Sequence, residues 1–199
     1  MGLFGICWDA LKWGFSTNFS HIGRWLLLTL LHIPVICFIP QGTLMKILKG
    51  EEPDIVLALK TLLNGFLLFL ILFIYGIVPV LLIKMIPGIG WIIGIILAIL
   101  FCLILIPAEI NYARSGRFGK AFAFGEIFGM ISNVGWGRYI LAFIVMIIFA
   151  VLVGIVLGGI SFLLTLIPVA GIVLASIFGL LTLIPLICWV FKYWNNVFA

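Results

Sequence analysis

The sequence predicts an all-α integral membrane protein, a bundle of about five transmembrane helices with two interfacial amphipathic helices. Of its 199 residues, 66% are hydrophobic and 9% are charged, and the mean hydropathy is +1.45. In soluble domains about a quarter of the residues are charged. The apolar runs are continuous, whereas a transmembrane barrel needs alternating segments of about ten residues. Helices satisfy their own backbone hydrogen bonds in hydrocarbon, so we expect a single helical membrane domain over residues 1–199.

The first predicted element is an interfacial helix over residues 3–16. Its apolar side chains recur at three- and four-residue spacing, namely Phe4, Cys7, Trp8, Leu11 and Phe15. Polar residues occupy the other side, which is typical of a helix lying in the headgroup plane. The sequence therefore predicts an anchor at the start of the chain.

Residues 24–46 allow two interpretations. As one helix they measure roughly 34 Å at about 1.5 Å per residue, long enough to cross the bilayer. Pro34 and Pro40 interrupt the run, so it could also enter and leave on the same side as a re-entrant hairpin. A single proline-broken span is favoured for its length, and the second interpretation stays open.

Four further spans are predicted as two hairpins. The first hairpin comprises residues 62–84 and 89–114, and the second comprises residues 138–166 and 170–194. Both turns contain Pro and Gly. The sequence Leu-Leu-Thr-Leu-Ile-Pro occurs at 163–168 and again at 180–185, which favours an origin of the two hairpins by duplication.

A hinge over residues 115–137 separates the two hairpins. Its Phe124, Ile127, Phe128 and Ile131 predict the second interfacial helix. With this topology, eight basic residues lie on the side of the hinge, and Lys84 lies on the other. The positive-inside rule therefore predicts a multi-pass protein of the cell membrane, with the hinge and the C-terminus in the cytoplasm. The side of the N-terminus stays open.

Glu109 is the first candidate for a functional residue. An ionisable side chain at membrane depth is by default a functional hypothesis, and Asn111 and Tyr112 would complete a polar site near Pro107, which removes a backbone donor. The simpler interpretation is that Glu109 lies near the interface and pairs with a basic residue of the hinge. His32 is a second candidate intramembrane polar residue, although a lone histidine more often bonds to a neighbouring helix.

A candidate site for lipid headgroups or for docking is basic, and it consists of Arg114, Arg117, Lys120 and Arg138. Cytoplasmic basic clusters bind anionic lipids. Alternatively, these residues only provide the minimum positive charge that keeps the hinge on the cytoplasmic side.

Small residues recur at four-residue spacing in three of the spans, at Gly90, Gly94 and Ala98, at Gly154 and Gly158, and at Gly171, Ala175 and Gly179. Such residues allow helices to approach closely. Packing within one subunit is the favoured interpretation, with homo-oligomer formation as the alternative.

The sequence contains no motif for catalysis, for a metal or for another cofactor. It has no nucleophile elbow, P-loop or zinc-protease motif. The four cysteines are scattered without C-x-x-C spacing. The basic excess reports topology rather than nucleic-acid binding. We therefore expect a protein that is not an enzyme and whose partners are the lipid bilayer and either other membrane subunits or further copies of itself.

The segment Ala113-Arg-Ser-Gly-Arg-Phe-Gly-Lys-Ala-Phe-Ala-Phe-Gly-Glu-Ile127 resembles a family of uncharacterised membrane proteins, domain of unknown function 4013. The opening Met-Gly-Leu-Phe and the Ile-Pro-bearing first span are similar to the same family. The resemblance implies a membrane location and an archaeal or bacterial source, but no activity.

The sequence is compatible with three functions. The first is a non-enzymatic scaffold or accessory subunit, which the predominance of structural over chemical features favours. The second is a small transporter or channel with Glu109 as its polar site. The third is an anionic-lipid-binding membrane protein.

Overall fold

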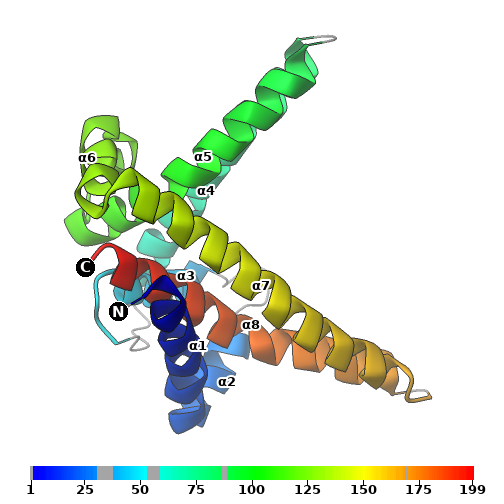
Figure 1. Cartoon of the computed structure of the whole chain (residues 1–199). Coiled ribbons are helices and arrows are strands. Elements are labelled where there is room, and N and C mark those ends of the chain that lie inside the picture. Colours follow the sequence, from blue (N-terminus) through cyan, green and yellow to red (C-terminus); the bar gives the residue numbers. More distant parts are fainter. Residues whose placement is uncertain (1, 31–37, 53–58, 87–88, 169) are drawn as a thin grey trace. The chain divides into compact units, whose positions relative to one another are not determined.

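A computed structural model describes residues 2–30, 38–52, 59–86, 89–168 and 170–199 (Figure 1). Within these ranges the chain forms helices and no strand, which confirms the predicted all-α class. The chain divides into two compact units. We name residues 34–133 the central unit, and residues 1–33 with 134–199 the terminal unit.

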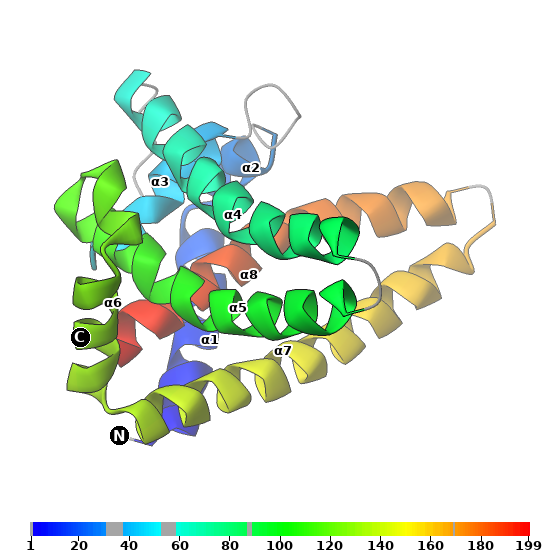
Figure 2. The same cartoon turned by 90° about the horizontal axis from the view of Figure 1, so that it is seen from above.

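The central unit is built on a helical hairpin. Its helices are α3 (Phe38–Leu48), α4 (Leu59–Met85), α5 (Gly90–Ser115), the 3-10 helix η1 (Phe118–Phe122) and α6 (Phe124–Val134), whose last residue belongs to the terminal unit. Helices α4 and α5 lie side by side (Figure 2).

Glycines set how closely these helices pack. A Cβ atom on Gly94 of α5 would lie 3.0 Å from the carbonyl oxygen of Pro79 in α4. Where α3 meets α4, a Cβ on Gly42 would overlap the carbonyl of Thr61, and a Cβ on Gly65 would overlap that of Phe38. Small residues of this kind allow the close backbone approach that holds membrane helices together.

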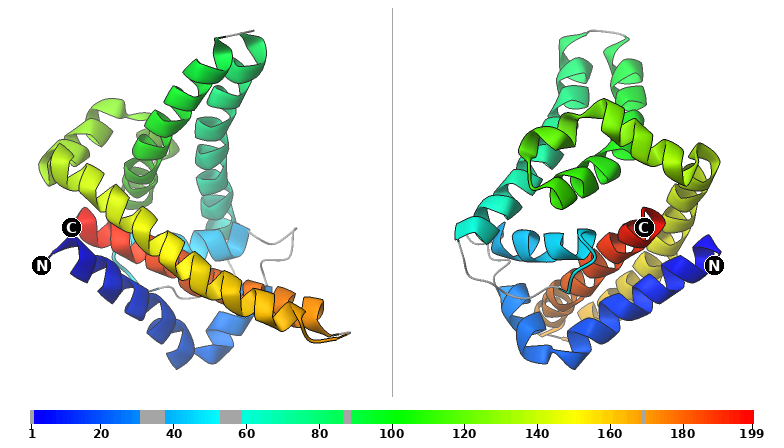
Figure 3. Two further views of the ribbon diagram at one scale, coloured as in Figure 1. Left: turned by 45° about the vertical axis from the view of Figure 1, so that its right-hand side comes forward. Right: turned by 90° about the vertical axis from the view of Figure 1, so that its left-hand side faces the viewer.

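The terminal unit contains α1 (Leu3–Ser20), α2 (Ile22–Leu30), α7 (Trp136–Thr165) and α8 (Gly171–Val197). Helices α7 and α8 form the second hairpin, and α1 runs along the C-terminal half of α8 (Figure 3). Contacts from Cys7 to Trp189 and from Gly14 to Pro185 show that α1 and α8 are antiparallel.

The face that α1 turns toward its own unit differs from the apolar stripe seen in the sequence. Its buried residues are Leu3, Ile6, Cys7, Ala10, Gly14 and Asn18. Phe4 and Trp8, both members of that stripe, are 57% and 50% exposed. Of that stripe only Cys7 is among the buried residues, whereas Phe4 and Trp8 keep about half of their surface exposed.

Four helices are long and apolar enough to cross a membrane, namely α4, α5, α7 and α8. They confirm the two predicted hairpins. Helices α2 and α3 have nine and eleven residues, and each is too short to span a bilayer alone. Because residues 31–37 lie outside the described residues, so does the choice between a single span and a re-entrant hairpin over 24–46.

Candidate functional site

The hinge end of the first hairpin begins where α5 stops. Gly116 adopts a left-handed conformation with φ of +68°, and its N–H donates to the carbonyl oxygen of Tyr112 across 2.8 Å. Glycine adopts this conformation without the steric penalty of a Cβ atom. The helix therefore ends at Ser115, and the chain turns into η1.

Three side chains then tie α5, η1 and α6 together. Asn111 Nδ2 donates to the carbonyl oxygen of Lys120 at 2.9 Å and to Glu126 Oε2 at 3.1 Å. The Lys120 ammonium forms an ion pair with Glu126 Oε1. Hydrogen bonds from Lys120 and Asn111 hold the pKa of the Glu126 carboxyl below its usual range. We name Asn111, Lys120 and Glu126 the hinge network.

Two tyrosines connect α4 to η1 and to α5. The Tyr75 hydroxyl donates to the carbonyl oxygen of Ala121 across 2.9 Å, and its ring stacks on that of Phe122 with centroids 5.6 Å apart. The Tyr112 hydroxyl lies 3.4 Å from the carbonyl oxygen of Asn64. The hinge is therefore fixed to both helices of its hairpin.

Glu109 is not part of the hinge network. It lies on α5, six residues before the end of the helix, and its side chain is half-buried. Among the described residues, its carboxylate makes no hydrogen bond and no ion pair, and Lys120 pairs with Glu126 instead. Glu109 therefore does not join Asn111 in the hinge network, although only Ile110 lies between them in the sequence.

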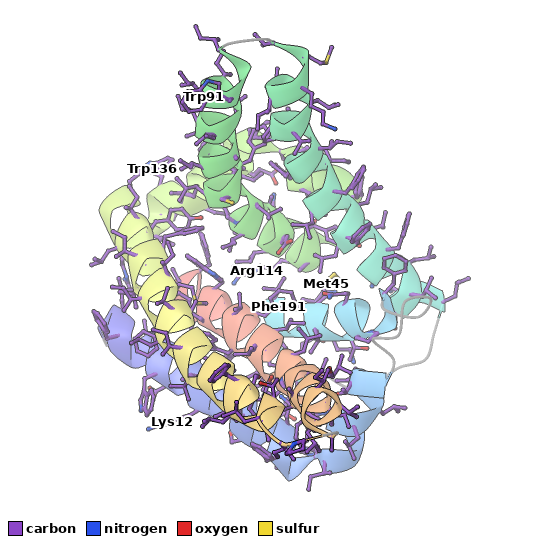
Figure 4. All side chains as sticks on the ribbon, turned by 90° about the vertical axis from the view of Figure 1, so that its right-hand side faces the viewer. Lys12, Met45, Trp91, Arg114, Trp136 and Phe191 are labelled. Atoms are coloured by element: carbon purple, nitrogen blue, oxygen red, sulfur yellow. The ribbon has the colours of Figure 1, made fainter. Side chains whose placement is uncertain are left out.

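The predicted basic site is divided between the two units. Arg114, labelled in Figure 4, and Arg117 are exposed in the central unit, where Lys120 is engaged by Glu126. Arg138 is exposed near the start of α7 in the terminal unit. The other predicted polar residue, His32, lies outside the described residues.

A family model described as "Protein of unknown function (DUF4013)" matches residues 26–164. The match covers more than half of the chain, from α2 through the first hairpin and the hinge to α7. The chain belongs to DUF4013. A comparison with curated proteins and with solved structures found no match.

Sequence reasoning missed a set of hydrogen bonds in the terminal unit of this DUF4013 chain. Trp25 Nε1 donates to the carbonyl oxygen of Leu181 at 2.9 Å, Trp189 Nε1 donates to that of Cys7 at 3.2 Å, and the Tyr193 hydroxyl donates to that of Ala142 at 2.8 Å. Tryptophan and tyrosine residues are common at the ends of membrane spans, where they anchor the helix at the interface. Here the polar atoms of Trp25, Trp189 and Tyr193 join α1, α2, α7 and α8 to one another.

Polar groups are also buried beside α1. Asn18 is buried, and its Nδ2 donates to the carbonyl oxygen of Gly14 at 2.5 Å. Arg24 Nη2 donates to the carbonyl oxygen of Thr17 at 3.0 Å, whereas Arg24 Nε is buried and finds no hydrogen-bond partner in the described part of the chain. No group of three or more His, Cys, Asp or Glu residues within the described ranges could hold a metal ion.

The small-residue positions of the DUF4013 chain fall into two classes. Gly94 packs against α4 within its own unit. Gly154 and Gly158 of α7 and Gly179 of α8 have nothing within 4 Å of a Cβ atom placed on them. Packing within its own unit therefore accounts for Gly94, whereas no helix of the described terminal unit lies against Gly154, Gly158 or Gly179.

Proposed function

We propose that this DUF4013 protein is a non-enzymatic accessory or scaffold subunit that holds another transmembrane helix on the outer face of α7. The observation that carries the proposal is the exposure of Gly154 and Gly158, which share one helix face with Ala150 and meet no neighbouring atom. Large apolar side chains flank them, and Val151 is 55% exposed. We name Ala150, Gly154 and Gly158 the α7 glycine face.

The chain's own packing supports this use of glycine. At Gly14, Gly42, Gly65 and Gly94, an added Cβ atom would lie 3.0 Å or less from a backbone atom of another helix. In a membrane, helices associate through van der Waals packing, because lipid provides no hydrophobic driving force between them. The α7 glycine face offers the same close approach, but to a helix that the terminal unit does not supply.

The arrangement of the polar side chains supports a role without catalysis. The members of the hinge network bond to one another and to backbone carbonyls. The tyrosine hydroxyls and tryptophan indoles likewise bond to carbonyl oxygens. These hydrogen bonds hold helices in place. Separately, the positive-inside rule places the basic hinge and the C-terminus of this subunit in the cytoplasm.

The test is the composition of the particle that a tagged protein forms in its native membrane. Gly154→Leu and Gly158→Leu would place branched side chains on the α7 glycine face. Gly159→Leu is the matched control, because Gly159 also has open space around it and points about 100° away from Gly158. After gentle extraction, we expect stoichiometric partner subunits with the wild type and the control, and their loss from both variants.

Two results would overturn the proposal. One is a particle of unchanged composition in all four proteins. The other is a wild-type particle that contains this chain alone, either as a monomer or as a homo-oligomer. A homo-oligomer that the α7 variants dissociate would assign the same face to self-association.

A second candidate function is a small transporter or channel, and one observation favours it. The Glu109 carboxylate lies on a membrane-spanning helix without a polar partner among the described residues. Ionisable groups in such segments commonly mark ion or substrate paths. Flux into liposomes that Glu109→Gln abolishes and Glu126→Gln preserves would support this function, and the absence of flux in the wild-type protein would remove it.

A further inference from the structure

The terminal unit contains an apolar groove between α1 and α7, of about 480 Å³. Trp8, Leu11, Lys12 and Phe15 line it from α1, and Phe149, Leu152, Val153, Val156 and Leu157 line it from α7. Its volume falls within the range of about 300–1,000 Å³ that is common for small-molecule sites. The wall is aliphatic and aromatic apart from the Lys12 side chain.

The α7 wall continues the face with which this helix packs inside the unit. Ala142, Val145 and Met146 are buried, and Phe149, Leu152 and Val153 follow at the same three- and four-residue spacing. None of these groove residues belongs to the α7 glycine face, and the centres of the two faces differ by about 130° at about 100° per residue. The groove is therefore separate from the surface on which the proposed function depends.

Lys12 supplies the charge at the groove. It is exposed at the outer edge of α1 (Figure 4), and its ammonium lies 5.2 Å from the centroid of the Trp8 ring. Within the described part of the chain, Lys12 makes no ion pair. Asp9 is exposed on the same helix but does not line the groove. The groove is therefore apolar, with the Lys12 ammonium as its one positive charge.

Exposed charged side chains also set the depth of α1. Asp9 and Lys12 are both exposed, and a charged group is costly in the hydrocarbon of a bilayer. They therefore belong at the level of the lipid headgroups, as in other amphipathic helices that lie at the interface. From Lys12, the apolar wall leads along α7, a helix that is apolar enough to span the membrane.

We propose that this groove is a binding site for one anionic phospholipid of the surrounding bilayer, with an acyl chain between α1 and α7 and its phosphate against the Lys12 ammonium. The apolar wall is complementary to the acyl chain, and the Lys12 ammonium is complementary to the phosphate. A basic residue near the membrane surface contributes about 1 kcal/mol to anionic-lipid binding, which corresponds to about fivefold in affinity.

The test is native mass spectrometry of the purified full chain, equilibrated in detergent with dioleoylphosphatidylglycerol or dioleoylphosphatidylcholine. Val153→Trp fills the groove, and Ile155→Trp is its control, because Ile155 is 66% exposed and lies outside the groove. Lys12→Gln removes the charge, and Lys84→Gln is its control in the central unit. Thermal unfolding of each variant shows whether it is folded.

The wild type and both controls should retain one phosphatidylglycerol about fivefold more tightly than phosphatidylcholine. Lys12→Gln should bind the two lipids equally, and Val153→Trp should bind neither at this site. Unchanged retention by Val153→Trp would overturn the proposal, and so would an unchanged lipid preference in Lys12→Gln. A dimer that Val153→Trp disrupts, without bound lipid in the wild type, would identify a second copy of the chain as the occupant.

Discussion

The indole Nε1–H of Trp25 donates a hydrogen bond to the carbonyl oxygen of Leu181, 156 residues away in the chain and 2.9 Å away in space. Leu181 lies four residues before Pro185 in α8. Proline has no backbone N–H, so the carbonyl four residues earlier loses its helical partner. Trp25 supplies the missing donor and thereby fixes α2 to α8 where Pro185 interrupts the backbone hydrogen bonds of α8.

This relationship predicts that Trp25→Phe destabilises the terminal unit. The aromatic ring is retained, but the Leu181 carbonyl loses its donor in a place with little access to water. Leaving a buried polar group unsatisfied costs about 1–3 kcal/mol. The expected result is a lower free energy of unfolding by that amount, measured by SDS-induced or thermal unfolding in detergent.

Pro185→Ala tests the cause of the effect. Alanine restores the backbone N–H and with it the helical bond to Leu181, so Trp25→Phe should cost much less in the Pro185→Ala background. The coupling energy from the double-mutant cycle should exceed about 0.5 kcal/mol. Equal costs in the two backgrounds would show that the indole stabilises the protein by other contacts.

A second prediction concerns Gly14, where α1 crosses α8. A Cβ atom at this position would lie 2.8 Å from the carbonyl oxygen of Pro185 and 3.0 Å from the backbone nitrogen of Trp189. Both neighbours are backbone atoms, which move less easily than side-chain ends. Gly14→Ala should therefore destabilise the protein by about 1–3 kcal/mol through overpacking, measured by the same unfolding assay.

Gly23→Ala is the matched control for this substitution. Gly23 is also helical, in α2, but nothing lies within 4 Å of a Cβ placed there. Alanine has the higher helix propensity, by about 0.8–1 kcal/mol, so the control should be neutral or stabilising. A similar loss of stability in both variants would count against the close approach of α1 and α8 as the cause.

The class of the fold and its four long spans could be predicted because apolar run length is a property of the sequence alone. Residues 66–83 form an unbroken apolar run, which predicts a span in hydrocarbon whatever its neighbours are. The spans end close to the predicted positions because Pro and Gly mark the turns and Gly116 marks the end of α5. These features act locally, so periodicity and turn residues report them.

The contacts that organise the two units could not be predicted in the same way. Trp25 and Leu181 are adjacent because of tertiary packing. The sequence around a tryptophan near a span end is the same whether or not its indole donates to a distant carbonyl. In a membrane protein both faces of a helix are apolar, so hydropathy does not distinguish the protein-facing side from the lipid-facing side. On the interfacial helix α1, the apolar stripe in the sequence includes Phe4, Cys7 and Trp8, and of these three the structure buries only Cys7, together with Ala10 and Gly14.

A third prediction concerns the pH dependence of the hinge network. The folded-state pKa of Glu126 is lowered by the hydrogen bonds from Lys120 and Asn111, so ionised Glu126 stabilises the folded state. This contribution is complete above the unfolded pKa of about 4.3 and is lost as the pH falls through the lower folded value. The difference in melting temperature between the wild type and Glu126→Gln should therefore shrink between pH 7 and pH 3.5.

The wild type should be the more stable protein at pH 7, by a small margin because the pair is exposed and screened by water. Lys84→Gln is a suitable control, since Lys84 is exposed and makes no ion pair among the described residues. A difference between the wild type and Glu126→Gln that is the same at both pH values would show that ionisation of Glu126 does not stabilise the hinge.

The final prediction concerns thiol reactivity in the folded protein. Cys7 and Cys188 are buried, whereas Cys102 is exposed. Burial raises the pKa of the Cys7 thiol to about 11, although the side chain of Trp189 partly opposes this shift. Because the thiolate is the reactive form, N-ethylmaleimide at pH 7.5 should leave Cys7 and Cys188 unmodified in the folded protein.

The experiment uses a Cys37→Ser background, with sites of modification identified by peptide mass spectrometry. Unfolding in SDS should make all three thiols reactive, which controls for their chemical competence. Introducing Gly14→Ala should raise the rate of modification at Cys7, because it forces α1 away from α8 and Cys7 packs on the same face as Gly14. Rapid modification of Cys7 in the folded protein without this substitution would contradict the packing of α1 against α8.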